Sequence, residues 1–99
     1  MILMVEHRVA DWDVWKRGFD ADQDVQERYG ATGYLLYRRQ DDPTVVTVLM
    51  QFPSRELLEA FVNDPSLADV TERAGVMGVP RMHTYIEAGA ADFAGRIAA

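Results

Sequence analysis

The segment from Thr44 to Phe52 limits the possible folds most strongly, because six of its nine residues are apolar. A β-strand points successive side chains to opposite faces of its sheet. A strand with one face in water therefore alternates apolar and polar residues, whereas this one carries Val, Leu or Met on both faces. The pattern predicts a central strand that is covered on both sides, by helices on one face and by a partner on the other.

The remaining segments predict one small α+β domain with the element order β-α-β-β-α-α-β. Right-handed crossovers in this order produce a ferredoxin-like (βαββαβ) fold, a four-stranded antiparallel sheet with its helices on one face. We expect this domain to span residues 1–87 and residues 88–99 to form a small-residue tail, frayed or weakly helical. The expected strands are 2–9, 33–40, 44–52 and 81–87, and the expected helices are 12–29, one that begins after Pro53-Ser54, and one from 65 to 74.

Turn and capping residues mark the boundaries between these segments. Asp11 is a predicted N-cap of the first helix, and Gly30 is its predicted stop. Asp41-Asp42-Pro43 is typical of the turn in a hairpin. Asp64-Pro65 is typical of an N-cap that is followed by proline at the first helical position. Within the first helix one stripe at spacings of three and four holds Trp15, Phe19, Asp22, Gln26 and Tyr29.

The uncovered face of the predicted sheet indicates a homodimer. A large exposed apolar face usually marks an interface. Two such sheets packed face to face in a symmetric dimer would cover both of them. A chain of 99 residues buries only about 60–65% of its unfolded surface by itself, so a partner would also add stability.

Composition argues against several classes of partner and cofactor. The net charge is −6, from 10 basic and 16 acidic residues, which disfavours nucleic acid and anionic membranes. There is no cysteine, so disulfides, thiolate metal sites and cysteine nucleophiles are excluded. No metal site is expected, because no His-x-x-His or Glu-x-x-His spacing occurs. No apolar run approaches the roughly 20 residues that span a bilayer, and we expect a cytoplasmic protein.

The candidate catalytic residues are two histidines and two tyrosines. His7 and His83 lie on strands that this topology makes neighbours, and imidazole can exchange protons near neutral pH. If the two share a face, they could form an acid/base pair or bind a ligand. Each could instead be an isolated strand histidine that is half exposed or bonded to the backbone. Tyr34 and Tyr85 could donate a hydrogen bond to a substrate carbonyl.

Aromatic residues at the start of the first helix could form the wall of a binding pocket. Trp12, Trp15 and Phe19 are close together in sequence, and pockets are mostly apolar with a few polar groups. The same cluster could equally be core packing. Met50 is suited to an adaptable cavity wall or to core filling.

Three segments resemble small bacterial proteins of the antibiotic-biosynthesis-monooxygenase-like, dimeric α/β-barrel superfamily. They are residues 5–16, residues 41–43 and residues 73–80. The resemblance covers about residues 2–87 and implies two sheets that pair in a homodimer and a pocket for an apolar or aromatic small molecule. The superfamily includes quinone-forming oxygenases, haem-degrading enzymes, lactone isomerases and polyketide cyclases, so the fold does not define the reaction.

The resemblance also suggests individual site residues. Residues 4–9 are similar to the first strand of the haem-degrading branch, where an Asn at the position of His7 points into the pocket. That branch carries a pocket Trp and a haem-ligating His on its later helices, and the second and third predicted helices of this chain contain neither. Haem is therefore not expected, and neither is any other cofactor. In the quinone-forming branch an Asn lies near the substrate, and Asn63 falls in that region. Phe52 and Phe61 occupy places where those relatives often carry Trp and His, so Phe61 and Asn63 are further candidates for substrate contact.

Together these features predict a cofactor-independent enzyme of polyketide-like secondary metabolism that acts on an aromatic or enolisable small molecule. His7 would be the acid/base group, Tyr34 or Tyr85 would polarise a carbonyl, and Trp15 with Phe19 would line the cavity. Oxygenation by O2, cyclisation and isomerisation all remain open. The alternative is a non-catalytic homodimer, either a small-molecule-binding one or a structural one whose pocket is filled by side chains.

Overall fold

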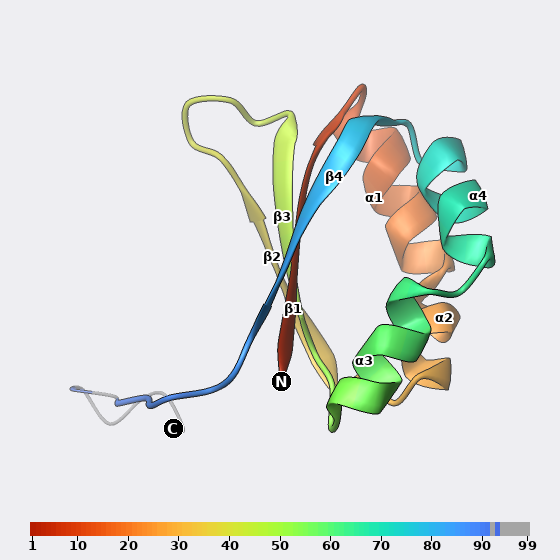
Figure 1. Cartoon of the computed structure of the whole chain (residues 1–99). Coiled ribbons are helices and arrows are strands. Elements are labelled where there is room, and N and C mark those ends of the chain that lie inside the picture. Colours follow the sequence, from red (N-terminus) through yellow and green to blue (C-terminus); the bar gives the residue numbers. More distant parts are fainter. Residues whose placement is uncertain (92, 94–99) are drawn as a thin grey trace.

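All four helices lie on one side of a four-stranded sheet (Figure 1). The structure is a computed structural model, and it describes residues 1–91 and 93 of the chain. The elements are β1 (Ile2–Val9), α1 (Trp12–Ala21), α2 (Gln23–Arg28), β2 (Gly33–Arg38), β3 (Val45–Gln51), α3 (Arg55–Val62), α4 (Ser66–Arg73) and β4 (Val76–Tyr85).

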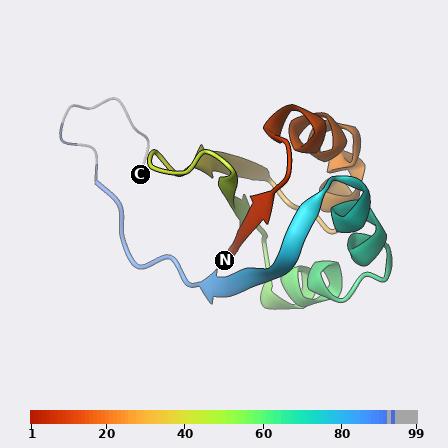
Figure 2. The ribbon, with the colours of Figure 1, turned by 90° about the horizontal axis from the view of Figure 1, so that it is seen from above.

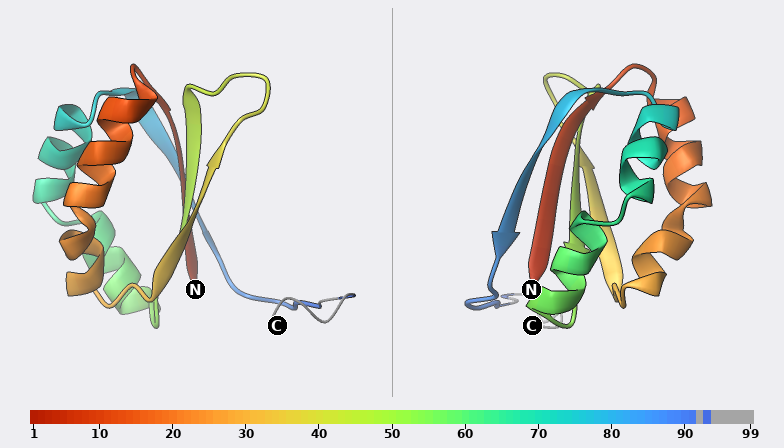
Figure 3. Two further views of the ribbon diagram at one scale, coloured as in Figure 1. Left: turned by 180° about the vertical axis from the view of Figure 1, so that it is seen from behind. Right: turned by 45° about the vertical axis from the view of Figure 1, so that its right-hand side comes forward.

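The strand order is β2-β3-β1-β4, and every neighbouring pair is antiparallel. This is the predicted ferredoxin-like α+β fold. Figure 2, seen from above, shows the sheet as one layer and the helices as a second layer on a single face. The two views in Figure 3 show the same separation, with none of the described elements packed over the other face of the sheet.

The predicted helix over residues 12–29 is in fact two helices that meet at Asp22. The backbone of Asp22 leaves the helical region, with φ −105° and ψ 16°. The polar residues around this point bury little apolar surface, and Asp competes for backbone hydrogen bonds, so the segment has little to hold it in one helix. Gly30 follows α2 with a positive φ of 80°, as expected for a helix stop.

The last strand begins earlier than predicted, at Val76 instead of residue 81, and ends at Tyr85 instead of residue 87. Gly75 ends the preceding helix with a φ of 78°, but Gly78, which also has a positive φ of 74°, lies inside β4. There the pairing with β1 slips, since Glu6 pairs with Arg81 and Arg8 pairs with Met77. Between these two pairs one residue of β1, His7, lies opposite three residues of β4, 78–80, which is a bulge of two extra residues.

The caps of the helices were predicted almost correctly. The Asp11 side chain accepts a hydrogen bond from the backbone N–H of Val14, as an N-cap does. At α4 the N-cap position is occupied by Pro65, one residue later than predicted. Asp64 still stabilises this end of the helix, because its side chain accepts hydrogen bonds from the Ser66 backbone and hydroxyl.

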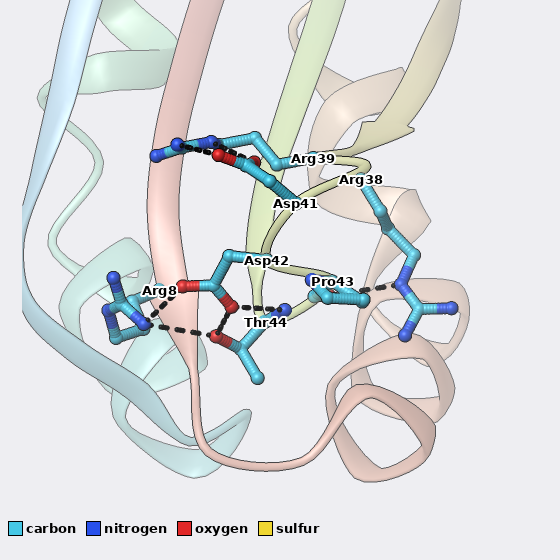
Figure 4. A network of polar contacts seen from close by, with 7 residues as sticks. All are labelled: Arg8, Arg38, Arg39, Asp41, Asp42, Pro43 and Thr44. Carbon is cyan, nitrogen blue, oxygen red and sulfur yellow. Dashed lines mark hydrogen bonds and ion pairs between the residues drawn. The ribbon is translucent and has the colours of Figure 1, made fainter.

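The loop between β2 and β3 is tied to β1 by a network of charged and polar groups (Figure 4). Asp42 accepts hydrogen bonds from the Thr44 hydroxyl at 2.5 Å and from the Arg8 guanidinium at 2.7 Å. The bonds from Thr44, and then the one from Arg8, lower the pKa of Asp42 to about 2. Arg39 pairs with Asp41 in the same loop. The predicted turn at residues 41–43 is therefore held in a defined position against the sheet.

The sheet face that points away from the helices carries several exposed apolar side chains. Leu35, Tyr37, Met77 and Tyr85 are each about half exposed, and the register places them all on this face. On β3 itself the face is mixed, because Thr47 and Gln51 alternate there with Val45 and Leu49. We call this surface the open face.

Beyond β4 the described part of the predicted tail, residues 88–91 and 93, contains neither helix nor strand. Residues 92 and 94–99 of that tail lie outside the described residues.

Candidate functional site

A cavity of about 430 Å³ lies between the sheet and the helices. Its sheet side is formed by side chains of β1, β3 and β4, and its other sides come from α1, α2, α3 and α4. Most of the lining is aliphatic or aromatic, for example Leu3, Val5, Val48, Met50, Met82, Trp15, Phe19, Val25, Phe61 and Val70. Such a wall suits an apolar or aromatic molecule.

His7 is the one buried polar or charged residue among the described part of the chain. Alternation along β1 points it toward the helices, where its ring centroid lies 5.3 Å from that of Trp15. The side chain lines the cavity and is 8% exposed, yet neither ring nitrogen has a hydrogen-bond partner among the described residues. Burial lowers the pKa of His7 below its ordinary value of 6.5, because the charged form loses its hydration.

The ring of His7 is therefore neutral at physiological pH, with one nitrogen that donates and one that accepts a hydrogen bond. In the observed conformation both nitrogens are covered by neighbouring atoms. The His7 ring would have to rotate slightly before either nitrogen could form a hydrogen bond with a molecule in the cavity.

A column of aromatic rings extends from His7 along α1. Trp12 and Trp15 are stacked at 5.6 Å between centroids, Trp15 and Phe19 at 4.9 Å, and Phe19 meets Tyr34 edge to face at 4.9 Å. The spacings of three and four residues place these side chains on one face of the helix. Trp15 and Phe19 line the cavity, while Trp12 lies at the end of the column, beneath the Arg38 guanidinium at 4.3 Å.

The polar part of the cavity lining comes from Asp22, Gln26, Asp64 and Thr71, all of them half-buried. Asp64 accepts a hydrogen bond from the Tyr29 hydroxyl at 2.5 Å in addition to those from Ser66. The bonds from Ser66, and then the one from Tyr29, lower the pKa of Asp64 to about 2, so this carboxyl group is ionised.

These polar residues were not predicted as site residues. Asp22 and Gln26 lie on the same helical stripe as Trp15 and Phe19, and that spacing was a signal that could have identified them. Asp64 and Thr71 come from the other end of the chain, and no local pattern indicates that they approach the first helix.

Of the ten predicted site residues, five line the cavity: His7, Trp15, Phe19, Met50 and Phe61. Tyr34 lies behind Phe19, and its hydroxyl accepts a hydrogen bond from Gln23 at 3.0 Å. Asn63 is exposed, and with His83 it borders a separate, more open hollow between β4 and α3.

The two histidines do not share a face of the sheet. His83 pairs with Met4 and Tyr85 pairs with Ile2, which places both of them on the open face. His7 points to the helices instead. An acid/base pair of His7 and His83 is therefore not formed within one protomer.

Among residues 1–91 and 93, no group of three or more histidine or acidic side chains is arranged to hold a metal ion. The same part of the chain contains no helix that is long and apolar enough to cross a membrane.

No protein-family model and no curated protein sequence matches the chain significantly. Solved structures do match. One, described as an antibiotic biosynthesis monooxygenase from Bordetella bronchiseptica, superposes with a TM-score of 0.72 at 14% identity and covers 88% of this chain and 96% of its own. Another of the same description, from Deinococcus radiodurans, has a TM-score of 0.66 at 11% identity and covers 94% and 98%.

This chain therefore has the fold of antibiotic biosynthesis monooxygenases, and the resemblance found in its sequence is confirmed at the level of the fold. SnoaB from Streptomyces nogalater, a cofactor-independent oxygenase, is among the similar structures. It has a TM-score of 0.67 at 11% identity, with 88% of this chain and 93% of SnoaB covered.

Proposed function

We propose that this chain is a cofactor-independent enzyme of polyketide-like secondary metabolism, which oxygenates, cyclises or isomerises an aromatic or enolisable small molecule in the cavity. The observation that carries the proposal is the buried, neutral His7, which has no hydrogen-bond partner among the described residues and lies on the otherwise apolar sheet side of the cavity.

A buried polar group without a partner destabilises a protein by about 1–3 kcal/mol. Such groups are rare in native proteins, and each requires an explanation. A ligand hydroxyl can both donate and accept, so it would supply the bond that His7 lacks. Trp15 and Phe19 line the same cavity, so the rings of such a ligand would pack against them.

The accepting nitrogen of His7 is suited to remove a proton from a phenol or an enolisable carbon. The surrounding apolar side chains exclude water and leave the resulting anion electron-rich. In the oxygenation, that anion is oxidised by O2: a ring CH2 becomes a carbonyl, one oxygen atom stays in the product, and the other leaves as water. Imidazolium returns the first proton to the departing oxygen, and the proton from the second C–H bond of the CH2 group completes the water molecule. In a cyclisation or isomerisation, the same proton would be moved within the substrate.

SnoaB, a cofactor-independent oxygenase, has the same fold, which supports the proposed oxygenation. At 11% sequence identity the similarity shows the fold alone. Neither Tyr34 nor Tyr85 lines the cavity of one protomer, so we give neither a role in the proton transfer.

The second candidate is a non-catalytic homodimer that binds a small molecule or serves a structural role. It is favoured by the mostly apolar lining, in which His7 is the one histidine among the described residues. In both candidates we propose that two copies pair through their open faces, because the exposed apolar residues there would otherwise contact water.

Two variants of His7 separate the candidates. The purified chain is incubated with hydroxylated three-ring anthrones, and O2 uptake, product mass and ligand binding are measured. His7→Gln keeps a hydrogen-bonding group but no base, so we expect binding to persist while turnover falls by about 100-fold or more. His7→Leu should lose both.

Turnover by His7→Leu at the wild-type rate would refute the role of His7 as a base. Tight binding of the anthrones by the wild-type protein, without conversion of any of them, would support the non-catalytic small-molecule-binding homodimer instead.

A further inference from the structure

The charges around the cavity are all of one sign. Its ionisable lining consists of His7, Asp22 and Asp64, and no Lys or Arg is among the described residues that line it. Six of the basic residues form ion pairs with acids elsewhere on the surface: Arg8, Lys16, Arg28, Arg39, Arg55 and Arg81. Three others donate to backbone carbonyls: Arg17, Arg38 and Arg73. The wall therefore offers no cation to an anionic ligand.

The negative charge at the cavity is maintained by the surrounding groups. Asp64 is held ionised by three hydrogen bonds, from the Ser66 backbone, the Ser66 hydroxyl and the Tyr29 hydroxyl. Asp22 lies at the junction of α1 and α2, and its side chain does not cap α2, so it stays available to the cavity. The charge of Arg28 also acts on Asp64, but Arg28 is exposed and pairs with Asp24 at 3.7 Å.

His7 provides an independent indication of a ligand. It is more than nine-tenths buried, it lines the same cavity, and its nitrogens have no partner among the described residues. A neutral imidazole needs one donor and one acceptor opposite it, and a hydroxyl group can serve as either. Carboxylates and phosphates accept but do not donate, and they would also be repelled by the two aspartates.

We propose that the cavity takes an uncharged aromatic molecule with a hydroxyl group and discriminates against carboxylate and phosphate derivatives of the same ring system. This inference rests on the proposed function, because it takes the cavity as the binding site. It adds the substrate class, which is an uncharged aromatic molecule. Any carboxylate or phosphate group of that molecule would have to be removed or esterified before binding.

Three probes of the same size test the charge preference. They are 9-anthracenemethanol, 9-anthracenecarboxylate and 9-anthracenemethylamine, which carry no charge, one negative charge and one positive charge at neutral pH. Binding is measured through energy transfer from the tryptophans, since Trp15 lines the cavity. We expect the alcohol to bind at least about tenfold more tightly than the carboxylate at low salt. The reason is the Coulomb repulsion between the ligand carboxylate and a cavity aspartate, which is large enough for this difference at separations up to about 8 Å.

Two further measurements separate a charge effect from a difference in fit. High salt should reduce the discrimination, because it screens the charges. Asp22→Asn should also reduce it, by strengthening carboxylate binding several-fold and leaving the alcohol unchanged. Glu27→Gln is the matched control, because it removes one negative charge from an exposed position on α2, the helix that follows Asp22, and Glu27 does not line the cavity. It should leave the discrimination as it is.

Each outcome bears on a different claim. Equal affinity for the alcohol and the carboxylate would overturn the charge inference and leave the cavity as the binding site. An equal effect of Glu27→Gln and Asp22→Asn would overturn the role of the cavity carboxylates. If none of the three probes binds, the proposed binding site itself fails, and the charge inference fails with it.

Discussion

Replacement of His7 by leucine should stabilise the protein without its ligand. The change removes two buried nitrogens that have no hydrogen-bond partner and leaves an apolar side chain beside Trp15. The relieved desolvation is worth about 1–3 kcal/mol, against about 1 kcal/mol for the change of shape in a packed wall. The net gain expected is about 0–2 kcal/mol, and each kcal/mol raises the Tm of a domain of this size by roughly 4–8 °C.

The gain should depend on pH with a definite sign. The pKa of His7 is lowered in the folded state by burial, whereas in the unfolded chain it stays near its ordinary value of 6.5. Below pH 6.5 the unfolded chain therefore takes up a proton that the folded chain refuses, and the wild-type protein loses stability as the pH falls. His7→Leu lacks this loss, so the difference between the two proteins should widen between pH 7.5 and pH 5.5.

Urea unfolding at fixed protomer concentration, followed by circular dichroism, measures both effects. His83→Gln is the matched control, because it replaces the other histidine, which lies on the open face and does not line the cavity. That variant should not give the stabilisation expected of His7→Leu, because it removes no buried nitrogen that lacks a partner. A His7→Leu protein that is less stable than wild type at pH 7.5, with a difference that does not change toward pH 5.5, would refute the reasoning.

Two further predictions concern Asp64 and the open face. The pKa of Asp64 is lowered to about 2, so the hydrogen bonds to its carboxylate stabilise the fold fully above about pH 4 and are lost as the pH falls toward 2. Asp64→Asn should therefore flatten the fall of Tm between pH 4 and pH 2. Scanning calorimetry at several pH values measures this, and a pH profile like that of the wild-type protein would contradict it. Leu35→Glu should weaken the proposed homodimer about a hundredfold or more, because it buries an unpaired charge in the seam, while Val14→Glu on the opposite side should not. Light scattering over a range of concentrations measures this, and a wild-type protein that stays monomeric throughout would disprove the pairing.

The element order was predictable from local patterns, because apolar periodicity and turn residues are properties of short segments. The break at Asp22 and the early start of β4 were not predicted, since both depend on how the segments pack. A helix of mixed polarity continues or breaks according to what it can bury. Gly78 reads as a helix stop in the sequence, although in the fold it allows the irregular stretch of β4.

The candidate site was predictable in part for the same reason. The resemblance to the haem-degrading branch implied that His7 faces the pocket, and helical spacing grouped Trp15 with Phe19. The face of His83 follows from its register with Met4, which is a tertiary property that the segment itself does not contain. Likewise, Asp64 reaches the cavity only through the placement of α4.

The irregularity in β4 restricts how the length of this strand can vary. The bulge adds two residues to β4 relative to β1, so the alternation of side chains stays in phase before and after the bulge. Val76 and Met82 both point to the helices, whereas Met77 and His83 both point away. Inserting or deleting a single residue between 78 and 80 would turn the following half of the strand over. Met82 would leave the cavity wall and His83 would enter it, so only changes by an even number of residues preserve both surfaces of the sheet.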